Sequence, residues 1–128
     1  MRVHRTSRLL TRRYDDAIRP TGLTITQFTL LNTIALQRPD SISDIGSRLD
    51  IDRTTLSRSL SLLQDAGFVA LGEPGADRKR AVLLTPKGQE KLAEAYELWQ
   101  GVQDEVEALL DEEELSALNR ALAKLRQG

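Results

Sequence analysis

The sequence contains no cysteine and a single histidine, His4, among its 128 residues. Without cysteine the chain has no disulfide, no thiol catalysis, no cysteine-ligated metal and no thiol-based redox sensing. One histidine near the N-terminus has no partners with which to build a histidine metal site or a catalytic triad. We therefore expect neither a metal nor a cofactor.

Long apolar runs are also missing. None approaches the roughly 20 residues that a helix needs to span a bilayer, and the N-terminus lacks the pattern of a signal peptide. Hydrophobic residues make up 40% of the chain and charged residues 29%, which is an ordinary soluble composition. We expect a cytoplasmic protein without a membrane partner.

The sequence offers little that would support an enzyme. Gly72 and Gly75 flank Pro74 in what reads as a turn, without the glycine spacing of a phosphate-binding loop. Carboxylates are numerous, but they lie on helix faces predicted to be exposed and do not converge on one another. No constellation of residues therefore indicates catalysis.

Charge is distributed unevenly along the chain. Residues 1–88 carry fourteen Lys or Arg and nine Asp or Glu, a net charge of +5, whereas residues 89–128 carry four and ten, a net charge of −6. A basic first part and an acidic last part are typical of a protein that binds nucleic acid with one part and assembles through another. Chance clustering is the alternative.

Residues 52–67 predict a helix with two different faces. Asp52 can cap its N-terminus, and Gly67 can supply the left-handed residue that ends it. Leu56, Leu60 and Leu63 recur at helical spacing and predict the buried face. The other face carries hydroxyl and guanidinium groups: Arg53, Thr54, Ser57, Arg58 and Ser61. Such a face suits the major groove of DNA, where these groups reach phosphates and base edges, although a solvated helix face is an alternative interpretation.

A shorter helix is predicted just before it, in residues 41–49. Ser41 followed three residues later by Asp44 resembles a capping box. Gly46 lies where a side chain would crowd the crossing with the next helix, and Ile51 can fill the angle between the two helices. The short turn gives the spacing of a helix-turn-helix.

A hairpin is predicted after Gly67. Residues 68–71 and 81–84 read as strands, and residues 73–77 as the turn between them. Arg78, Lys79 and Arg80 cluster at the tip. A hairpin with such a tip is a wing that can lie along a phosphate backbone or enter a minor groove.

In this order and spacing, the motifs resemble the winged helix-turn-helix of the MarR family, the bacterial multiple-antibiotic-resistance-type regulators. The resemblance covers nearly the whole chain and rests on residues 22–28, 44–46, 55–58, 67–69, 77–80 and 84–88. Two positions depart from the family pattern. Leu71 stands where the family often has a basic residue. The family's Asp-x-Arg wing motif, counted from Asp77, falls on Lys79, so the family's arginine corresponds to either Arg78 or Arg80.

The resemblance implies binding to double-stranded DNA and, often, to a small aromatic or phenolic effector between the DNA-binding and dimerisation parts. The residues expected to contact DNA are Ser41, Ser43, Arg53, Thr54, Thr55, Ser57, Arg58, Ser61, Arg78, Lys79 and Arg80. Tyr14 and Trp99 could line an effector pocket, although an aromatic residue on an apolar helix face is more often core.

Amphipathic helices are predicted on both sides of this unit, in residues 2–19 and 86–126. The leucines after Asp111 repeat with 3-4-3 spacing, which is typical of a coiled coil. A second subunit is the simplest partner for these apolar faces, and the resemblance implies terminal helices that interleave in a two-fold dimer. An intramolecular helical hairpin is the alternative. The residues expected at the dimer interface are Val3, Leu10, Tyr14, Val106, Leu109, Leu115, Leu118, Leu122 and Leu125.

We therefore predict a mainly α fold with a small β-hairpin wing, in which a winged helix-turn-helix (residues 23–85) is flanked by N- and C-terminal dimerisation helices in a single protomer (residues 1–128). The predicted function is that of a sequence-specific transcription regulator, a repressor that binds a pseudo-palindromic operator as a homodimer and is released by a small aromatic ligand. The alternative is a winged-helix protein–protein adaptor without sequence-specific DNA binding.

Overall fold

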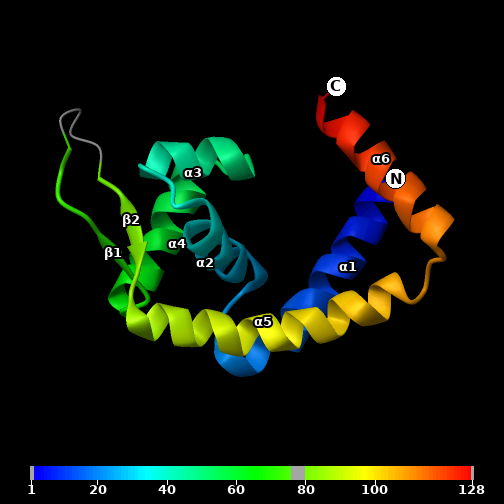
Figure 1. The fold of residues 1–128 in the computed structure, drawn as a ribbon, viewed down its shortest axis with the longest axis horizontal. Coiled ribbons are helices and arrows are strands. Elements are labelled where there is room, and N and C mark those ends of the chain that lie inside the picture. The colour runs from blue at the N-terminus through cyan, green and yellow to red at the C-terminus, as the bar shows by residue number, and fades with distance from the viewer. Residues whose placement is uncertain (1, 76–79, 128) are drawn as a thin grey trace.

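A computed structural model describes residues 2–75 and 80–127 of the chain. The elements, in chain order, are α1 (Arg2–Ile18), a short 3-10 helix η1 (Arg19–Thr21), α2 (Ile25–Gln37), α3 (Ile42–Leu49), α4 (Arg53–Asp65), β1 (Val69–Leu71), β2 (Val82–Leu84), α5 (Pro86–Glu107) and α6 (Glu112–Gln127). The long helix α5 connects two groups of elements: α2, α3, α4 and the hairpin lie at its first end, and α1 and α6 at its other end (Figure 1). The predicted mainly α fold with a hairpin wing is confirmed.

The hydrophobic core lies among α2, α3, α4 and the two strands. Leu56, Leu60 and Leu63 of α4 are buried, as their spacing predicts, and pack with a group of side chains from the other elements that includes Leu31 and Ile45. Full burial of a leucine stabilises a fold by about 1.5–3 kcal/mol. This row of leucines therefore decides which face of α4 is turned toward solvent.

Side-chain caps fix where the helices begin. Five helices start at a residue whose side chain accepts a hydrogen bond from the backbone N–H three residues later: Thr24, Ser41, Asp52, Thr85 and Asp111. At Ser41, where the sequence resembles a capping box, the hydroxyl accepts from the Asp44 N–H, and the Asp44 carboxylate accepts from the backbone N–H of Asp40 (3.4 Å) and binds Arg48. Each cap satisfies an amide that the first turn would otherwise leave without a partner.

The hairpin is antiparallel, with Val69 opposite Leu84 and Leu71 opposite Val82. Each strand is one residue shorter at its first end than the sequence predicts. Phe68 is outside the strand because its N–H still bonds to the Leu63 carbonyl at the end of α4. The predicted left-handed residue there is confirmed, since Gly67 has φ +83°.

Helix α6 has almost no packing within the protomer. It begins with a reciprocal pair of hydrogen bonds between Asp111 and Glu114, and it has no buried residue. Leu118 is 44% exposed and Leu125 is 70% exposed. This exposure does not fit an intramolecular helical hairpin, which would cover the leucine seam. No helix in the described parts of the chain is both long and apolar enough to cross a membrane.

Candidate nucleic-acid interface

A three-residue turn joins helices α3 and α4, which cross at close range. A Cβ atom on Gly46 would lie 3.3 Å from the Leu56 side chain, which confirms that the crossing leaves little room there. Asp50 ends α3 in the left-handed conformation, with φ +53°, and Ile51 packs against the core as expected. This arrangement is a helix-turn-helix.

The N-terminus of α4 is held by two bonds between the same pair of residues. The Asp52 carboxylate accepts from the Thr55 backbone N–H at 3.0 Å and from the Thr55 hydroxyl at 2.7 Å. The hydrogen bonds from Thr55 lower the pKa of Asp52, so the carboxylate stays ionised. The Thr55 hydroxyl, which the sequence assigns to DNA contact, donates its proton to the cap and has only acceptor capacity left for a ligand.

Five further polar side chains of α4 point into solvent. Arg53, Thr54, Ser57, Arg58 and Ser61 are all exposed. Within the described residues, no hydrogen bond or ion pair occupies any of these five side chains. They form one surface, which we call the α4 polar face. Its donors are free to bind an external partner.

Helix α3 contributes fewer exposed polar side chains to the candidate interface than the sequence suggests. Ser43 is exposed, but Ser41 is only 6% exposed, and its hydroxyl accepts from the Asp44 N–H at 3.1 Å. Ser41 therefore lies outside the exposed surface. Sequence reasoning missed Arg48, which binds Asp44 with two bonds of 3.0 Å and donates to Gln37 of α2 at 2.8 Å. The hydrogen bonds to Asp44 raise the pKa of Arg48, and the network links the end of α3 to α2.

The wing lies at the same end of α5 as the helix-turn-helix (Figure 1). Arg80 is exposed, and its Nε donates to the Gly72 carbonyl at 2.8 Å. This bond crosses from one arm of the hairpin to the other and leaves the remaining guanidinium nitrogens available. Asp77, Arg78 and Lys79 lie outside the described residues.

The residues predicted for a dimer interface are mostly exposed in the protomer. Large exposed side chains are Val3, Leu10, Leu109, Leu118, Leu122 and Leu125. Val106 and Leu115 are half-buried. Leu9 and Leu98 are exposed as well and were not predicted to be part of the interface. They lie in the predicted segments 2–19 and 86–126, and a count of every large apolar side chain in those segments would have found both.

Tyr14 and Trp99 belong to an aromatic cluster that packs α1, α2 and α5 together. The centre of the Trp99 ring lies 6.2 Å from that of Tyr14, 5.8 Å from that of Phe28 and 5.6 Å from that of Tyr96. The Tyr14 hydroxyl donates to Gln103 Oε1 at 2.6 Å. Partial burial, and then the nearby Glu107 carboxylate, raise the pKa of Tyr14, so the hydroxyl stays protonated. The two rings touch each other and neither lines the pocket described next.

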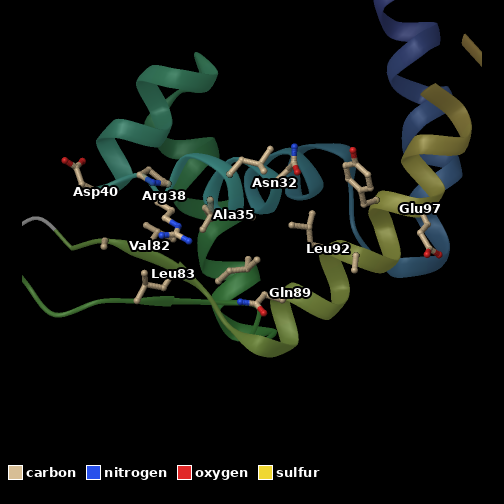
Figure 2. Close-up of a pocket in the computed structure, with 16 residues that line it drawn as sticks. Asn32, Ala35, Arg38, Asp40, Val82, Leu83, Gln89, Leu92 and Glu97 are labelled. Atoms are coloured by element: carbon tan, nitrogen blue, oxygen red, sulfur yellow. The ribbon is translucent and has the colours of Figure 1, made fainter. Parts of the chain in front are cut away.

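A pocket of about 1110 Å³ lies between the end of α2, the connection from α2 to α3, strand β2 and the first half of α5 (Figure 2). Its apolar walls include Ala35, Val82 and Leu92, and Arg38 reaches it from the end of α2. Tyr96 joins this pocket to the aromatic cluster. Sequence reasoning did not find the pocket because its walls come from four segments that only the tertiary fold brings together.

A helix-turn-helix with an exposed polar second helix and a hairpin beside it defines the class of winged helix-turn-helix proteins. Residues 21–80 match the model of the MarR family. The chain is 37% identical to the M. tuberculosis transcriptional regulator MosR in a structure with DNA, with a TM-score of 0.85 over 98% of this chain and 90% of MosR. It is 25% identical to an M. tuberculosis MarR family protein in complex with p-aminosalicylic acid, with a TM-score of 0.73 over 96% of this chain and 94% of the other. The HTH-type transcriptional regulator YwoH of Bacillus subtilis is 24% identical over 92 residues, or 72% of this chain and 67% of YwoH.

The chain belongs to the MarR family of winged helix-turn-helix transcription regulators. The resemblance read from its motifs is therefore confirmed.

Proposed function

We propose that the protein is a repressor that binds a pseudo-palindromic operator as a homodimer and is released by a small aromatic ligand. The observation that carries the proposal is the α4 polar face, in which two arginines and three hydroxyl residues are exposed and have no intramolecular partner among the described residues. Arginine and hydroxyl side chains on a recognition helix are the groups that reach base edges and phosphates in a major groove. Bound to a promoter, the protein competes with polymerase in the cytoplasm.

The uncovered seam of α6 supports a homodimer. Leu118, Leu122 and Leu125 are exposed, and α6 has no buried residue in the described part of the chain. A second copy supplies the same seam, and a two-fold dimer places two copies of α4 on successive turns of one face of DNA. MosR, a relative with 37% identity, is a transcriptional regulator whose structure has been determined with DNA.

The pocket between α2, β2 and α5 supports control by a ligand. Its volume of about 1110 Å³ is slightly above the range of about 300–1,000 Å³ that is usual for small-molecule sites. Its walls include strand β2 of the wing and the connection into α3, so a molecule bound there touches both parts of the DNA-binding unit. A relative is known in complex with p-aminosalicylic acid, and Arg38 offers a cation for a carboxylate of that kind.

Selection of bound duplexes from a random pool tests the function. The proposal expects an enriched pseudo-palindrome whose half-sites lie about one helical turn apart. A protein–protein adaptor would bind every duplex weakly and enrich no sequence. Enrichment of a single, non-repeated half-site would retain DNA binding but contradict the homodimer.

A further inference from the structure

The end of the recognition helix α4 is bonded directly to the start of α5. The carbonyls of Ala66, Gly67 and Phe68 follow the last residue of α4, and all three accept hydrogen bonds from two residues at the beginning of α5. Lys87 Nζ donates to the Ala66 carbonyl at 2.9 Å, the Thr85 hydroxyl donates to the Gly67 carbonyl, and the Thr85 N–H donates to the Phe68 carbonyl at 3.0 Å. The last carbonyls of α4 are already bonded by the N–H groups of residues 66–68, so α5 bonds the three carbonyls that come directly after the helix.

The two segments also lie as close as their backbones allow. A Cβ atom on Gly88 would stand 2.0 Å from the Phe68 carbonyl oxygen, so only glycine permits the approach. The Thr85 hydroxyl also accepts from the Gly88 N–H at 3.0 Å, as the cap of α5. One hydroxyl thus caps α5 and holds the end of α4 at the same time. We call Thr85, Lys87 and Gly88 the α4–α5 joint.

We propose that the α4–α5 joint fixes the angle between the recognition helix and α5, and thereby sets the distance between the two recognition helices of the dimer. The inference rests on the proposed function, in which a homodimer reads two half-sites. Because α5 leads from the joint to the end of the molecule where α1 and α6 lie, a rotation at the joint moves α4 relative to the dimer axis. Thr85 and Lys87 are positioning residues and have no need to touch DNA.

Lys87 can be tested because the chain offers a matched control. Lys87 and Lys91 both lie over the Phe68 ring, at 5.5 and 6.0 Å from its centre. Lys91 pairs with Glu94 at 3.2 Å, on its own helix, whereas Lys87 binds the end of α4. Lys87 is exposed, so Lys87→Met keeps the core intact. Lys91→Met removes the same charge one turn later.

The distance between recognition helices can be measured without DNA. The sequence has no cysteine, so Ser61→Cys provides a single site for a spin label on each α4. Pulsed electron paramagnetic resonance then measures the distance between the two labels in the dimer. We expect a narrow distribution for the parent and for Lys91→Met, and a broadened or shifted one for Lys87→Met that Lys87→Arg restores. An unchanged distribution in Lys87→Met, or an equal change in both methionine variants, overturns the inference.

A second measurement uses operators whose half-sites are moved apart or together by one base pair. The parent protein should bind the selected spacing more tightly than the altered ones. In Lys87→Met this ratio of affinities should fall about threefold, which is the scale of one hydrogen bond. Lys91→Met should keep it. If the parent protein shows no dipolar coupling between labels and no spacing preference, the homodimer itself is contradicted. This outcome distinguishes failure of the proposed function from failure of the proposal about the joint.

Discussion

Asp52 and Thr55 are joined twice at the start of the recognition helix, through the Thr55 backbone N–H at 3.0 Å and the Thr55 hydroxyl at 2.7 Å. Both bonds end on the Asp52 carboxylate, which stands where the dipole of α4 favours a negative charge. The cap therefore couples the ionisation of one exposed carboxyl group to the order of the helix that faces DNA.

The first prediction concerns the pH dependence of this cap. The pKa of Asp52 is lowered by its bonds to Thr55, so the cap stabilises the fold above the ordinary Asp pKa of about 3.9 and loses that contribution as pH falls through the lower, folded value. Asp52→Asn keeps an acceptor but has no charge to lose. Urea denaturation should give the parent a higher free energy of unfolding than Asp52→Asn at pH 7. This difference should shrink below about pH 4. A difference that does not change with pH would rule out the carboxylate as its source.

The second prediction concerns base reading by the α4 polar face. Arg58 is exposed in the first half of α4, the part of a recognition helix that reaches base edges. Arg58→Ala should relax the preference at one fixed position of each half-site by about 1–3 kcal/mol if the arginine contacts a guanine with two bonds. Affinities for a set of operator variants measure this, with Arg120→Ala on α6 as the control. An equal loss on every variant would reassign Arg58 to phosphate contact.

The third prediction concerns the wing. Replacing Arg78 and Arg80 by alanine should weaken binding to all duplexes and leave the central consensus unchanged, because arginines in a minor groove read its width and potential. Each lost phosphate contact reduces the slope of log affinity against log salt by about 0.9. Titrations at several salt concentrations measure the slope. A rewritten central consensus with an unchanged slope would reverse the roles of the wing and α4.

Local signals in the sequence are enough to predict most of the fold. The cap at Asp52, the left-handed Gly67 and the spacing of Leu56, Leu60 and Leu63 each depend on a few neighbouring residues, and the structure confirms all of them. The exposed side of α4 follows directly, because a helix that buries one row of leucines turns the opposite side toward solvent.

Features that join distant segments are not predictable in this way. The pocket takes walls from α2, β2 and α5, and the α4–α5 joint brings Lys87 to a carbonyl 21 residues earlier in the chain. Ser41 is a smaller example. Its place at the start of α3 is evident from sequence, but its burial depends on what the fold packs around it.

The fourth prediction concerns assembly through α6. Leu118→Asp puts a carboxylate into the exposed leucine seam and should convert a dimer at micromolar concentration into a 14.3 kDa monomer, because burying an unpaired charge is costly. Operator affinity should fall with it, since two half-sites are no longer bound jointly. Asn119→Asp adds the same charge at the next, exposed position and should leave the dimer intact. Sedimentation equilibrium decides between these outcomes, and a parent protein that sediments as a monomer contradicts the dimer.

The last prediction places the effector in the pocket of Figure 2 and not beside the ring pair of Tyr14 and Trp99. p-Aminosalicylate, used as the probe, should raise the thermal midpoint of the protein and weaken operator binding; a ligand at 100 times its dissociation constant stabilises the state it binds by about 2.7 kcal/mol. Ala35→Phe extends a side chain into the pocket from α2 and should abolish both effects. Tyr14→Phe removes the hydroxyl that donates to Gln103, outside the pocket lining, and should leave both effects unchanged. If Tyr14→Phe abolishes the response and Ala35→Phe does not, the ligand binds beside the aromatic cluster. In that case its link to the DNA-binding unit would run through the packing of α1 on α5 instead of through β2 and the connection into α3.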